Sequence, residues 1–308
     1  MQTKEIIREI ERLKKEKNAI ILAHYYARPE VQDIADYIGD SLGLSRQAAE
    51  TQADVILFCG VHFMAETASI ISPDKTILTP TEYAGCSLAE GASAKGLQKW
   101  KEKNPDGLVV SYVNTTAEVK AWTDYCCTSS NALKVVESLP KDKKILFGPD
   151  RNLGAYIREK TGRDMELWDA ACFVHERIST EAILETLELY PDADILIHPE
   201  SAGAHSQEVL TNERCFMYST AGILKHARES DKKQFVIATE PEILHFLHKE
   251  NTGKTFIPIQ PENRCFHMKQ SGLWEVLEAL RLNRYEVKVP ADIREKALLS
   301  IERMMAIG

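Results

Sequence analysis

Short apolar runs alternate with amphipathic stretches along the whole chain. Runs such as Ala19–His24, Ile56–Phe58 and Thr76–Pro80 have the length of buried strands, and Pro, Gly and Asp turn signals separate them from helix-like segments. Strands that alternate with helices are typical of parallel βαβ connections, in which helices cover both faces of a sheet. The pattern therefore predicts an α/β fold.

This strand–helix pattern occurs three times. The run Leu108–Val113 lies 88 residues after the run at Ala19, and a third copy at Ile195–His198 is offset from the first by 174. Single residues match between the units as well. Between the first and the second unit, the matched pairs are His24 with Tyr112, Glu30 with Glu118, Val31 with Val119, Asp36 with Asp124 and Ser41 with Ser129. If the third unit has four extra residues in its turn, its Glu208, Val209 and Ser219 take the places of Glu30, Val31 and Ser41. A repeat of about ninety residues predicts three homologous three-layer αβα domains with parallel sheets, related by pseudo-threefold symmetry.

The repeat also predicts the domain boundaries. We expect residues 1–86 together with a C-terminal tail, 266–308, to form the first unit, residues 87–172 the second and residues 173–265 the third. The tail contains a helical pattern at Leu273–Leu282, a strand-like segment at Tyr285–Val289 and a final helix at Ala291–Met305, and we expect it to pack on the first unit.

Composition and charge narrow the classes of function. A net charge of -8 gives the chain no electrostatic reason to bind nucleic acid or anionic lipid. The segment Met1–Asn18 has a charged helical pattern, and no run approaches the roughly 18 apolar residues of a membrane-spanning helix. We therefore expect a cytoplasmic protein without a nucleic-acid or membrane partner.

The chain has seven cysteines, an odd number that argues against a disulfide framework in a cytoplasmic protein. Three of them, Cys86, Cys172 and Cys265, each follow the last strand of one repeat. We expect Cys59 to lie in the hydrophobic core and Cys126, Cys127 and Cys215 to have structural roles. Three thiolates that converge on one point fit a metal, and the spacing alone leaves iron–sulfur and zinc equally open. In a [4Fe–4S] cluster held by three cysteines, one iron stays open and can act as a Lewis acid.

Polar residues recur at the carboxyl ends of the first strands, where ligands bind in parallel α/β sheets. These sets are His24-Tyr25-Tyr26, Tyr112-Val113-Asn114 and His198-Pro199-Glu200. A second recurring set lies where helices are expected to start, and consists of Asp40-Ser41, Thr128-Ser129-Ser130 and Ser219-Thr220. Free backbone N–H groups and hydroxyls at such positions favour anions. The two sets together predict a central pocket for a small, multiply anionic substrate.

In its short sequence motifs the chain resembles the quinolinate synthase A family. The resemblance extends from about Ala19 to Met268 and is carried by Ala23-His24-Tyr25-Tyr26, Gly39-Asp40-Ser41-Leu42, Phe63-Met64-Ala65-Glu66-Thr67, Ala84-Gly85-Cys86-Ser87, Tyr112-Val113-Asn114, Cys127-Thr128-Ser129, Gly148-Pro149-Asp150-Arg151-Asn152-Leu153-Gly154, Val174-His175-Glu176 and His198-Pro199-Glu200. The third cysteine of the family usually lies in Cys-x-Asn-Met-Lys, and here the sequence is Cys265-Phe266-His267-Met268-Lys269.

The resemblance implies an activity, a cofactor and a set of site residues. The activity is the condensation of iminoaspartate with dihydroxyacetone phosphate to quinolinate, with release of phosphate and water, in de novo NAD biosynthesis. One [4Fe–4S] cluster per chain is expected on Cys86, Cys172 and Cys265, with one open iron. Catalytic roles are expected for His24, Tyr26, Tyr112, His198 and Glu200, and substrate binding for Asp40, Ser41, Asn114, Ser129, His175, Ser219 and Thr220.

The resemblance leaves some points open. An L-aspartate oxidase or aspartate dehydrogenase is expected to supply the iminoaspartate, and the protein is expected to be a monomer or a homodimer. Two other functions are compatible with the residues alone. One is a different [4Fe–4S] hydro-lyase acting on a small hydroxy acid, and the other is a non-catalytic anion-binding protein with idle or zinc-bound cysteines.

Overall fold

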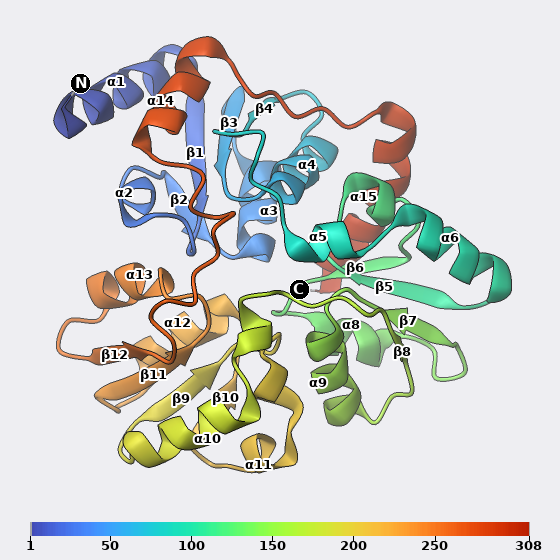
Figure 1. Cartoon of the computed structure of the whole chain (residues 1–308). Coiled ribbons are helices and arrows are strands. Elements are labelled where there is room, and N and C mark those ends of the chain that lie inside the picture. Colours follow the sequence, from blue (N-terminus) through green and yellow to red (C-terminus); the bar gives the residue numbers. More distant parts are fainter. Residues whose placement is uncertain (1, 308) are drawn as a thin grey trace.

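Three lobes surround a common centre, and each is built on one parallel four-stranded sheet (Figure 1). The computed structural model describes residues 2–307; Met1 and Gly308, which belong to the predicted N-terminal helix and C-terminal tail, lie outside the described residues. The sheets have the same strand order, namely β2-β1-β3-β4, β6-β5-β7-β8 and β10-β9-β11-β12. The predicted fold class, three αβα units with parallel sheets, is confirmed.

In the first lobe, helices cover both faces of the sheet. Its elements are α1 (Thr3–Glu16), β1 (Ala19–His24), α2 (Pro29–Gln32), β2 (Tyr37–Gly39), α3 (Ser41–Glu50), β3 (Val55–Cys59), α4 (His62–Ile71), β4 (Thr76–Leu78) and α5 (Ser87–Gly91). Ile21 and Leu57 belong to the apolar cluster beneath α1, whereas their neighbours Leu22 and Ile56 belong to the cluster beneath α3 and α4. Successive strand side chains point to opposite faces, so one fully apolar strand supplies two cores.

The second lobe repeats this order of elements. It contains α6 (Ala94–Lys103), β5 (Leu108–Tyr112), α7 (Ala117–Lys120), β6 (Tyr125–Cys127), α8 (Ala132–Ser138), β7 (Ile145–Phe147), α9 (Arg151–Thr161), β8 (Glu166–Leu167) and the 3₁₀ turn η1 (His175–Arg177). Helix α9 begins where the Asp150 side chain accepts hydrogen bonds from the backbone N–H groups of Asn152 and Leu153, and it ends at Gly162, whose φ of 63° lies in the left-handed region.

The third lobe has the same plan with a longer connection after its first strand. It contains α10 (Thr180–Leu189), β9 (Asp194–Ile197), η2 (Ala202–His205), α11 (Gln207–Leu210), β10 (Cys215–Met217), α12 (Thr220–Glu229), β11 (Gln234–Ala238), α13 (Ile243–Glu250) and β12 (Thr255–Pro258). The extra turn η2 lies in the connection between β9 and β10, where the sequence comparison needed inserted residues.

Strand register confirms the repeat at the level of single residues. Ile20 pairs with Ile56, Leu108 with Ile145 and Asp194 with Phe235, which are the equivalent pairs in the three units. The match of Ser219 with Ser41 is wrong by one residue. In the first unit, His24 pairs with Gly39, which lies two residues before Ser41. In the third unit, the residue equivalent to Gly39 is Tyr218, whose N–H donates to the Ile197 carbonyl. The connection before β10 is therefore one residue longer than expected, and Thr220 is the equivalent of Ser41.

The C-terminal tail contacts two lobes. Helix α14 (Leu273–Leu282) packs on α1, and Glu286 forms a bridge with Leu78 at the edge of the first sheet, whereas α15 (Ala291–Ile307) packs against α7 and β6 of the second lobe. Figure 1 shows the two tail helices, in red, at different lobes. The domain boundaries given above stay a prediction, and the tail links the first lobe to the second.

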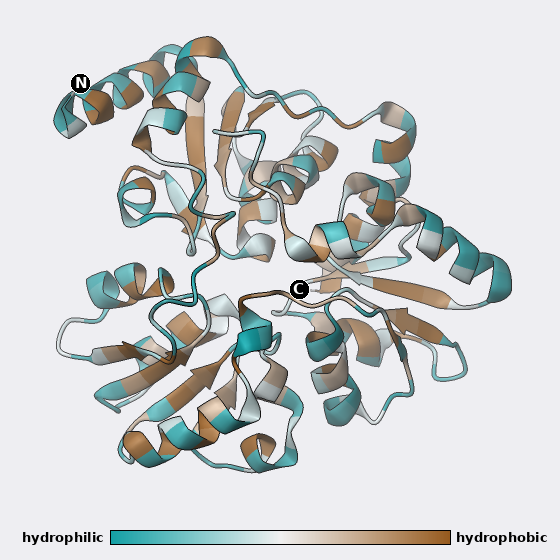
Figure 2. Ribbon diagram, viewed as in Figure 1, coloured by the Kyte–Doolittle hydropathy of each residue, from teal (hydrophilic) through white to brown (hydrophobic). Residues whose placement is uncertain are grey.

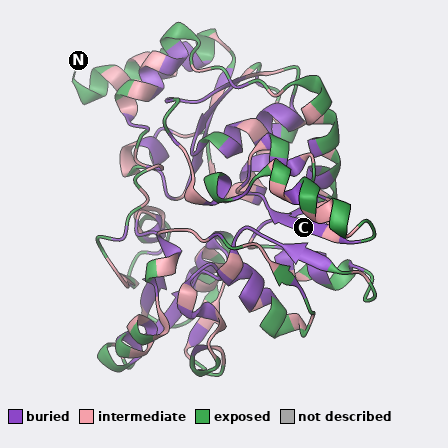
Figure 3. Cartoon of the chain, turned by 45° about the vertical axis from the view of Figure 1, so that its right-hand side comes forward, coloured by how far each residue is buried: buried purple, intermediate pink, exposed green. Residues whose placement is uncertain are grey.

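Apolar residues gather in the strands and polar residues on the outer faces of the helices (Figure 2). The strands are accordingly buried, and exposed residues lie on the helices and outer loops (Figure 3). Across residues 2–307, no helix combines the length and the apolar character needed to cross a membrane.

Candidate active site

The three sheets direct their carboxyl ends toward one central cavity. The cavity holds about 720 Å³ of space between atoms, counted out to its mouth, which is in the range of small-molecule sites. Its lining includes every predicted site residue except Ser219, namely His24, Tyr26, Asp40, Ser41, Cys86, Tyr112, Asn114, Ser129, Cys172, His175, His198, Glu200, Thr220 and Cys265. Parallel strand ends meet at one edge of each sheet, so a threefold arrangement brings three such edges together.

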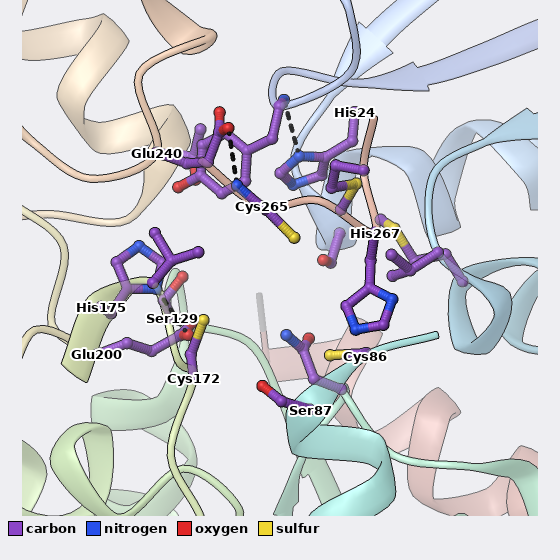
Figure 4. Close-up of a pocket in the computed structure, with 18 of the residues that line it drawn as sticks. His24, Cys86, Ser87, Ser129, Cys172, His175, Glu200, Glu240, Cys265 and His267 are labelled. Atoms are coloured by element: carbon purple, nitrogen blue, oxygen red, sulfur yellow. Dashed lines mark hydrogen bonds and ion pairs between the residues drawn. The ribbon is translucent and has the colours of Figure 1, made fainter. Parts of the chain in front are cut away.

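Cys86, Cys172 and Cys265 reach the cavity from three loops, each placed after the last strand of its sheet. Their sulfur atoms face the same open space in Figure 4. Among the described residues, however, these three sulfurs do not all lie within 4.8 Å of one another, which is the spacing that one ion would need. Burial raises the pKa of all three thiols, that of Cys86 to about 12. The protein alone therefore does not favour thiolates, and a positively charged metal centre would supply the missing stabilisation.

Two of the three cysteine loops are held by buried carboxylates. Asp150 Oδ2 accepts a hydrogen bond of 2.8 Å from the N–H of Cys172, and Glu240 Oε1 accepts one of 3.2 Å from the N–H of Cys265. Both carboxylates are 0% exposed and follow the third strand of their sheets. The equivalent residue of the first unit is Val61, so this position supplies no carboxylate to the backbone of Cys86. Burial and the nearby Glu200 raise the pKa of Asp150 to about 7.

Glu200 is the centre of a buried acid–base group. Its Oε1 accepts a hydrogen bond of 2.5 Å from the Tyr112 hydroxyl, and its Oε2 lies 3.1 Å from His175 Nδ1. His198 Nδ1 lies 3.6 Å from Oε1. Burial disfavours the charged carboxylate, but His175 and His198 outweigh it and lower the pKa of Glu200 below its usual range. Glu200 is therefore ionised at neutral pH and can accept a proton.

A second hydrogen-bonded chain connects this group to the first lobe. The Tyr26 hydroxyl lies 2.6 Å from Thr239 Oγ1 and 3.2 Å from Thr220 Oγ1, and Thr239 Oγ1 lies 2.7 Å from His175 Nε2. Burial raises the pKa of Tyr26 and of Tyr112 above the usual range, so both phenols stay protonated. The arrangement therefore links a neutral hydroxyl donor at Tyr26 to the carboxylate of Glu200 through Thr239 and His175.

Two further histidines at the strand ends are buried and uncharged. Burial and the charge of Lys269 lower the pKa of His24 to about 3, and burial lowers the pKa of His198 to about 3 against the opposing effect of Glu200. His198 Nε2 lies 3.2 Å from Ser129 Oγ. Neutral imidazoles at these positions can accept or pass a proton without adding positive charge to the cavity.

Hydroxyl and amide groups line the rest of the cavity. Ser41, Ser129 and Thr220 occupy equivalent positions of the three units, and Ser41 and Thr220 are the first residues of α3 and α12. Ser219 instead caps α12, where its hydroxyl accepts a hydrogen bond from the N–H of Gly222. The Oδ1 atom of Asn114 is buried without a hydrogen-bond partner among residues 2–307. A buried polar atom at a cavity wall is costly unless a ligand satisfies it.

Sequence reasoning missed several residues of this site. Asp150, Thr239, Glu240, His267 and Lys269 lie at the cavity or hold its walls. Asp150 and Glu240 could have been found, because they occupy the same repeat position after the third strand. Thr239 had no such signal, since it acts on Tyr26 of another unit. Lys269 has no equivalent in the repeat, although it is the last residue of the motif that contains Cys265.

A buried cavity with three inward-facing thiols beside an ionised carboxylate and neutral imidazoles defines the chain as an α/β enzyme with a site able to hold a metal. A sequence model described as "Quinolinate synthetase A protein" matches residues 8–306. Curated relatives bear the name quinolinate synthase: that of Pyrobaculum aerophilum is 48% identical over 96% of this chain and 97% of its own length. That of Thermus thermophilus is 47% identical over 100% of this chain and 99% of its own. The chain belongs to the quinolinate synthetase A family.

Proposed function

We propose that this chain is a quinolinate synthase, which condenses iminoaspartate with dihydroxyacetone phosphate to quinolinate, with release of phosphate and water, in de novo NAD biosynthesis. Family membership over nearly the whole chain supports the reaction. The observation that carries the proposal is the single cavity in which one cysteine from each repeat faces the hydrogen-bonded group around Glu200.

In this proposal Cys86, Cys172 and Cys265 hold one [4Fe–4S] cluster. The donor set fits, because three sulfurs from three loops face one space and are spread too widely for a single ion. Soft thiolate ligands suit an iron–sulfur cluster. When bound, a cluster with three cysteine ligands supplies a Lewis acid at its open iron.

Protein side chains carry the proton transfers of the reaction. Formation of the pyridine ring requires removal of a proton beside an imine, interconversion of a ketose and an aldose, and loss of water. Glu200 is the general base, because it is ionised and its two oxygens face the Tyr112 hydroxyl and His175 Nδ1. Tyr26 donates its hydroxyl proton to an enediol oxygen, and Thr239 and His175 connect it to Glu200. His198 and His24, both neutral, accept or return protons at the strand ends.

Anionic groups of the substrates bind at the hydroxyl positions. Ser41 and Thr220 present hydroxyls beside the free N–H groups at the starts of α3 and α12, each a helix of ten residues. Such N-termini attract phosphate and carboxylate. Ser129 and Asp40 complete this side of the cavity, and the unpaired Asn114 Oδ1 accepts a hydrogen bond from a substrate hydroxyl or amine. Ser219 contributes by fixing the start of α12.

The proposal includes the setting of the enzyme. It acts in the cytoplasm on small molecules, receives iminoaspartate from an L-aspartate oxidase or aspartate dehydrogenase, and works as a monomer or homodimer. The three repeat units, with the boundaries predicted from the sequence, act as one body around the cavity.

Anaerobic turnover tests the function. Protein purified without oxygen is incubated with iminoaspartate generated in situ and with dihydroxyacetone phosphate, and quinolinate is measured. We expect quinolinate, a brown protein and about four irons per chain. The variant Cys86→Ser loses iron and activity, whereas the control Cys215→Ser, whose sulfur lies in β10 outside the cavity lining, keeps both. An iron-loaded protein that forms no quinolinate would instead support a different hydro-lyase.

A further inference from the structure

One group of three ligand atoms in the cavity is already close enough for a single ion. Cys172 Sγ, one ring nitrogen of His175 and one carboxylate oxygen of Glu200 all lie within 4.8 Å of one another. His175 and Glu200 are each 3% exposed, and Cys172 is half-buried. Thiolate, imidazole and carboxylate are the three ligand types of zinc sites, so the donor chemistry suits Zn²⁺.

The neighbours of these atoms are arranged as the partners of metal ligands usually are. His175 Nε2 is engaged with Thr239 Oγ1 at 2.7 Å, and Nδ1 faces Glu200 Oε2 at 3.1 Å, so an ion between these two atoms would replace their direct contact. The other oxygen of Glu200 is held by the Tyr112 hydroxyl at 2.5 Å. Hydrogen bonds that fix the far side of a ligating imidazole and carboxylate orient both groups and strengthen metal binding.

The backbone of the third ligand is fixed too. The N–H of Cys172 donates to the buried carboxylate of Asp150, and Cys172 lies three residues before His175 at the start of the 3₁₀ turn η1. Two ligands therefore come from one short rigid segment, and the third, Glu200, from the carboxyl end of β9. The ligand atoms are no more than 4.8 Å apart, so movements of about 1 Å or less bring them to the spacing around a tetrahedral zinc ion.

We propose that the cluster-free chain binds one Zn²⁺ ion through Cys172, His175 and Glu200, with the fourth position open to the cavity. The same zinc ion excludes the [4Fe–4S] cluster, because both need Cys172. The zinc site stands on the geometry alone, and only its competition with the cluster rests on the proposed function. Zn²⁺ binds such a donor set more tightly than Fe²⁺, so zinc holds the site when iron is scarce.

Zinc binding to the full-length chain tests the site directly. Cluster-free protein, prepared anaerobically with reduced thiols, is titrated with Zn²⁺ against a chromophoric chelator. We expect one tightly bound zinc per chain and, by X-ray absorption, one sulfur ligand with nitrogen and oxygen ligands. A first shell of three sulfurs, or zinc binding no tighter than that of the ligand variant Cys172→Ser, overturns the proposal.

Matched cysteine variants separate this site from the three-cysteine site. Cys172→Ser and Glu200→Gln are expected to weaken zinc binding at least tenfold, since each removes one of three protein ligands. Cys86→Ser and Cys265→Ser are expected to leave the affinity within about twofold, although the proposed function requires both for cluster assembly. Equal losses in Cys86→Ser and Cys172→Ser would place the ion on the three cysteines and contradict the assignment. Circular dichroism confirms that each variant is folded.

Competition is measured separately by cluster assembly on zinc-loaded protein. We expect the absorbance of the cluster to appear only after zinc is removed by a chelator. If zinc binds with one sulfur ligand but does not delay cluster assembly, the zinc site stands. The claim that zinc and the cluster both need Cys172, which rests on the proposed function, is then overturned. The zinc titration therefore tests the zinc site, and the assembly experiment tests its competition with the cluster.

Discussion

Glu200 contacts three of the acid–base groups of the cavity, namely Tyr112, His175 and His198. It contacts Tyr112 at the end of β5 and His175 in η1, and it is reached from Tyr26 of the first lobe through Thr239 and His175. A carboxylate that is ionised and fully buried is expensive unless hydrogen bonds satisfy it, so each of these partners also stabilises the charge. The residue proposed as the general base therefore also holds its neighbours in place through hydrogen bonds.

Replacement of Glu200 by Gln is expected to reduce kcat by about 10²- to 10⁴-fold, the usual contribution of a general base. The amide keeps the size of the side chain but cannot accept a proton at neutral pH. Anaerobic assays of quinolinate formation measure the loss. Glu213→Gln, on an exposed loop, is the control and should keep full activity. Normal turnover by Glu200→Gln would remove the residue from catalysis.

Asp150 and Glu240 position two of the three cysteine loops, and their loss should appear in the stability of the proposed cluster. Asp150→Asn replaces one acceptor oxygen by an NH₂ group and breaks the bond to Cys172 or those at the start of α9. We expect cluster loss after exposure to a chelator to become about 10- to 100-fold faster. The decay of visible absorbance under anaerobic conditions follows the loss, and Asp169→Asn, at an exposed site, is the matched control. Equal decay rates in the two variants would contradict this role.

At the scale of elements, α15 fastens the tail to the second lobe. Ala297, Ile301 and Met304 on one face of this helix are fully buried. Buried polar contacts accompany them: the Ser300 hydroxyl donates to the Lys120 carbonyl at 3.2 Å, and Asn131 Nδ2 donates to the Met304 carbonyl at 2.9 Å. The helix therefore covers α7 and β6, which would otherwise expose an apolar face of the second sheet.

Truncation of one buried side chain of α15 tests this packing. Ile301→Ala should lower the free energy of unfolding by about 2–5 kcal/mol, because a cavity replaces a fully buried side chain. Leu299→Ala, two residues away on the same helix and 56% exposed, should change it by less than about 0.5 kcal/mol. Chemical denaturation of both variants, monitored by circular dichroism, gives the comparison. Similar costs at the two positions would mean that α15 does not dock as described.

At the scale of the whole molecule, contacts at the cavity also join the lobes in a ring. Tyr26 bonds Thr220 and Thr239 between the first and third lobes, Tyr112 bonds Glu200 between the second and third, and Ser130 bonds Asp40 between the second and first at 2.8 Å. Lys269 adds a further link, because its ammonium lies 2.7 Å from Glu240 and donates to the Tyr26 carbonyl at 2.6 Å. The contacts that join the three lobes are therefore also contacts of the cavity wall.

Removal of the Lys269 charge should weaken this ring. Lys269→Met leaves the buried Glu240 without its cation, and loss of one partner of a buried pair costs about 3–5 kcal/mol. Lys249→Met, which removes an exposed pair with Asp33 across the same lobes, should cost about 1 kcal/mol or less. Denaturation midpoints of the two cluster-free variants provide the measurement. Equal destabilisation would show that the buried pair has no special part in holding the lobes together.

The sequence by itself determined the fold class, the threefold repeat and most of the cavity lining. These follow from local pattern: apolar runs of strand length, and chemically similar residues such as Cys86, Cys172 and Cys265 at one position of each unit. A repeat fixes which strand end each residue occupies, and parallel sheets bring those ends to one edge.

Only the tertiary structure decided how these residues are connected. Thr220 rather than Ser219 lines the cavity because the strand register, not the sequence alignment, sets the length of the connection before β10. The link from Tyr26 through Thr239 to His175 joins residues that lie far apart along the chain, and the approach of Glu200 to Cys172 and His175 joins two separate segments. Such contacts depend on how the three lobes pack around the cavity. A local sequence pattern does not determine the distances between side chains of different lobes.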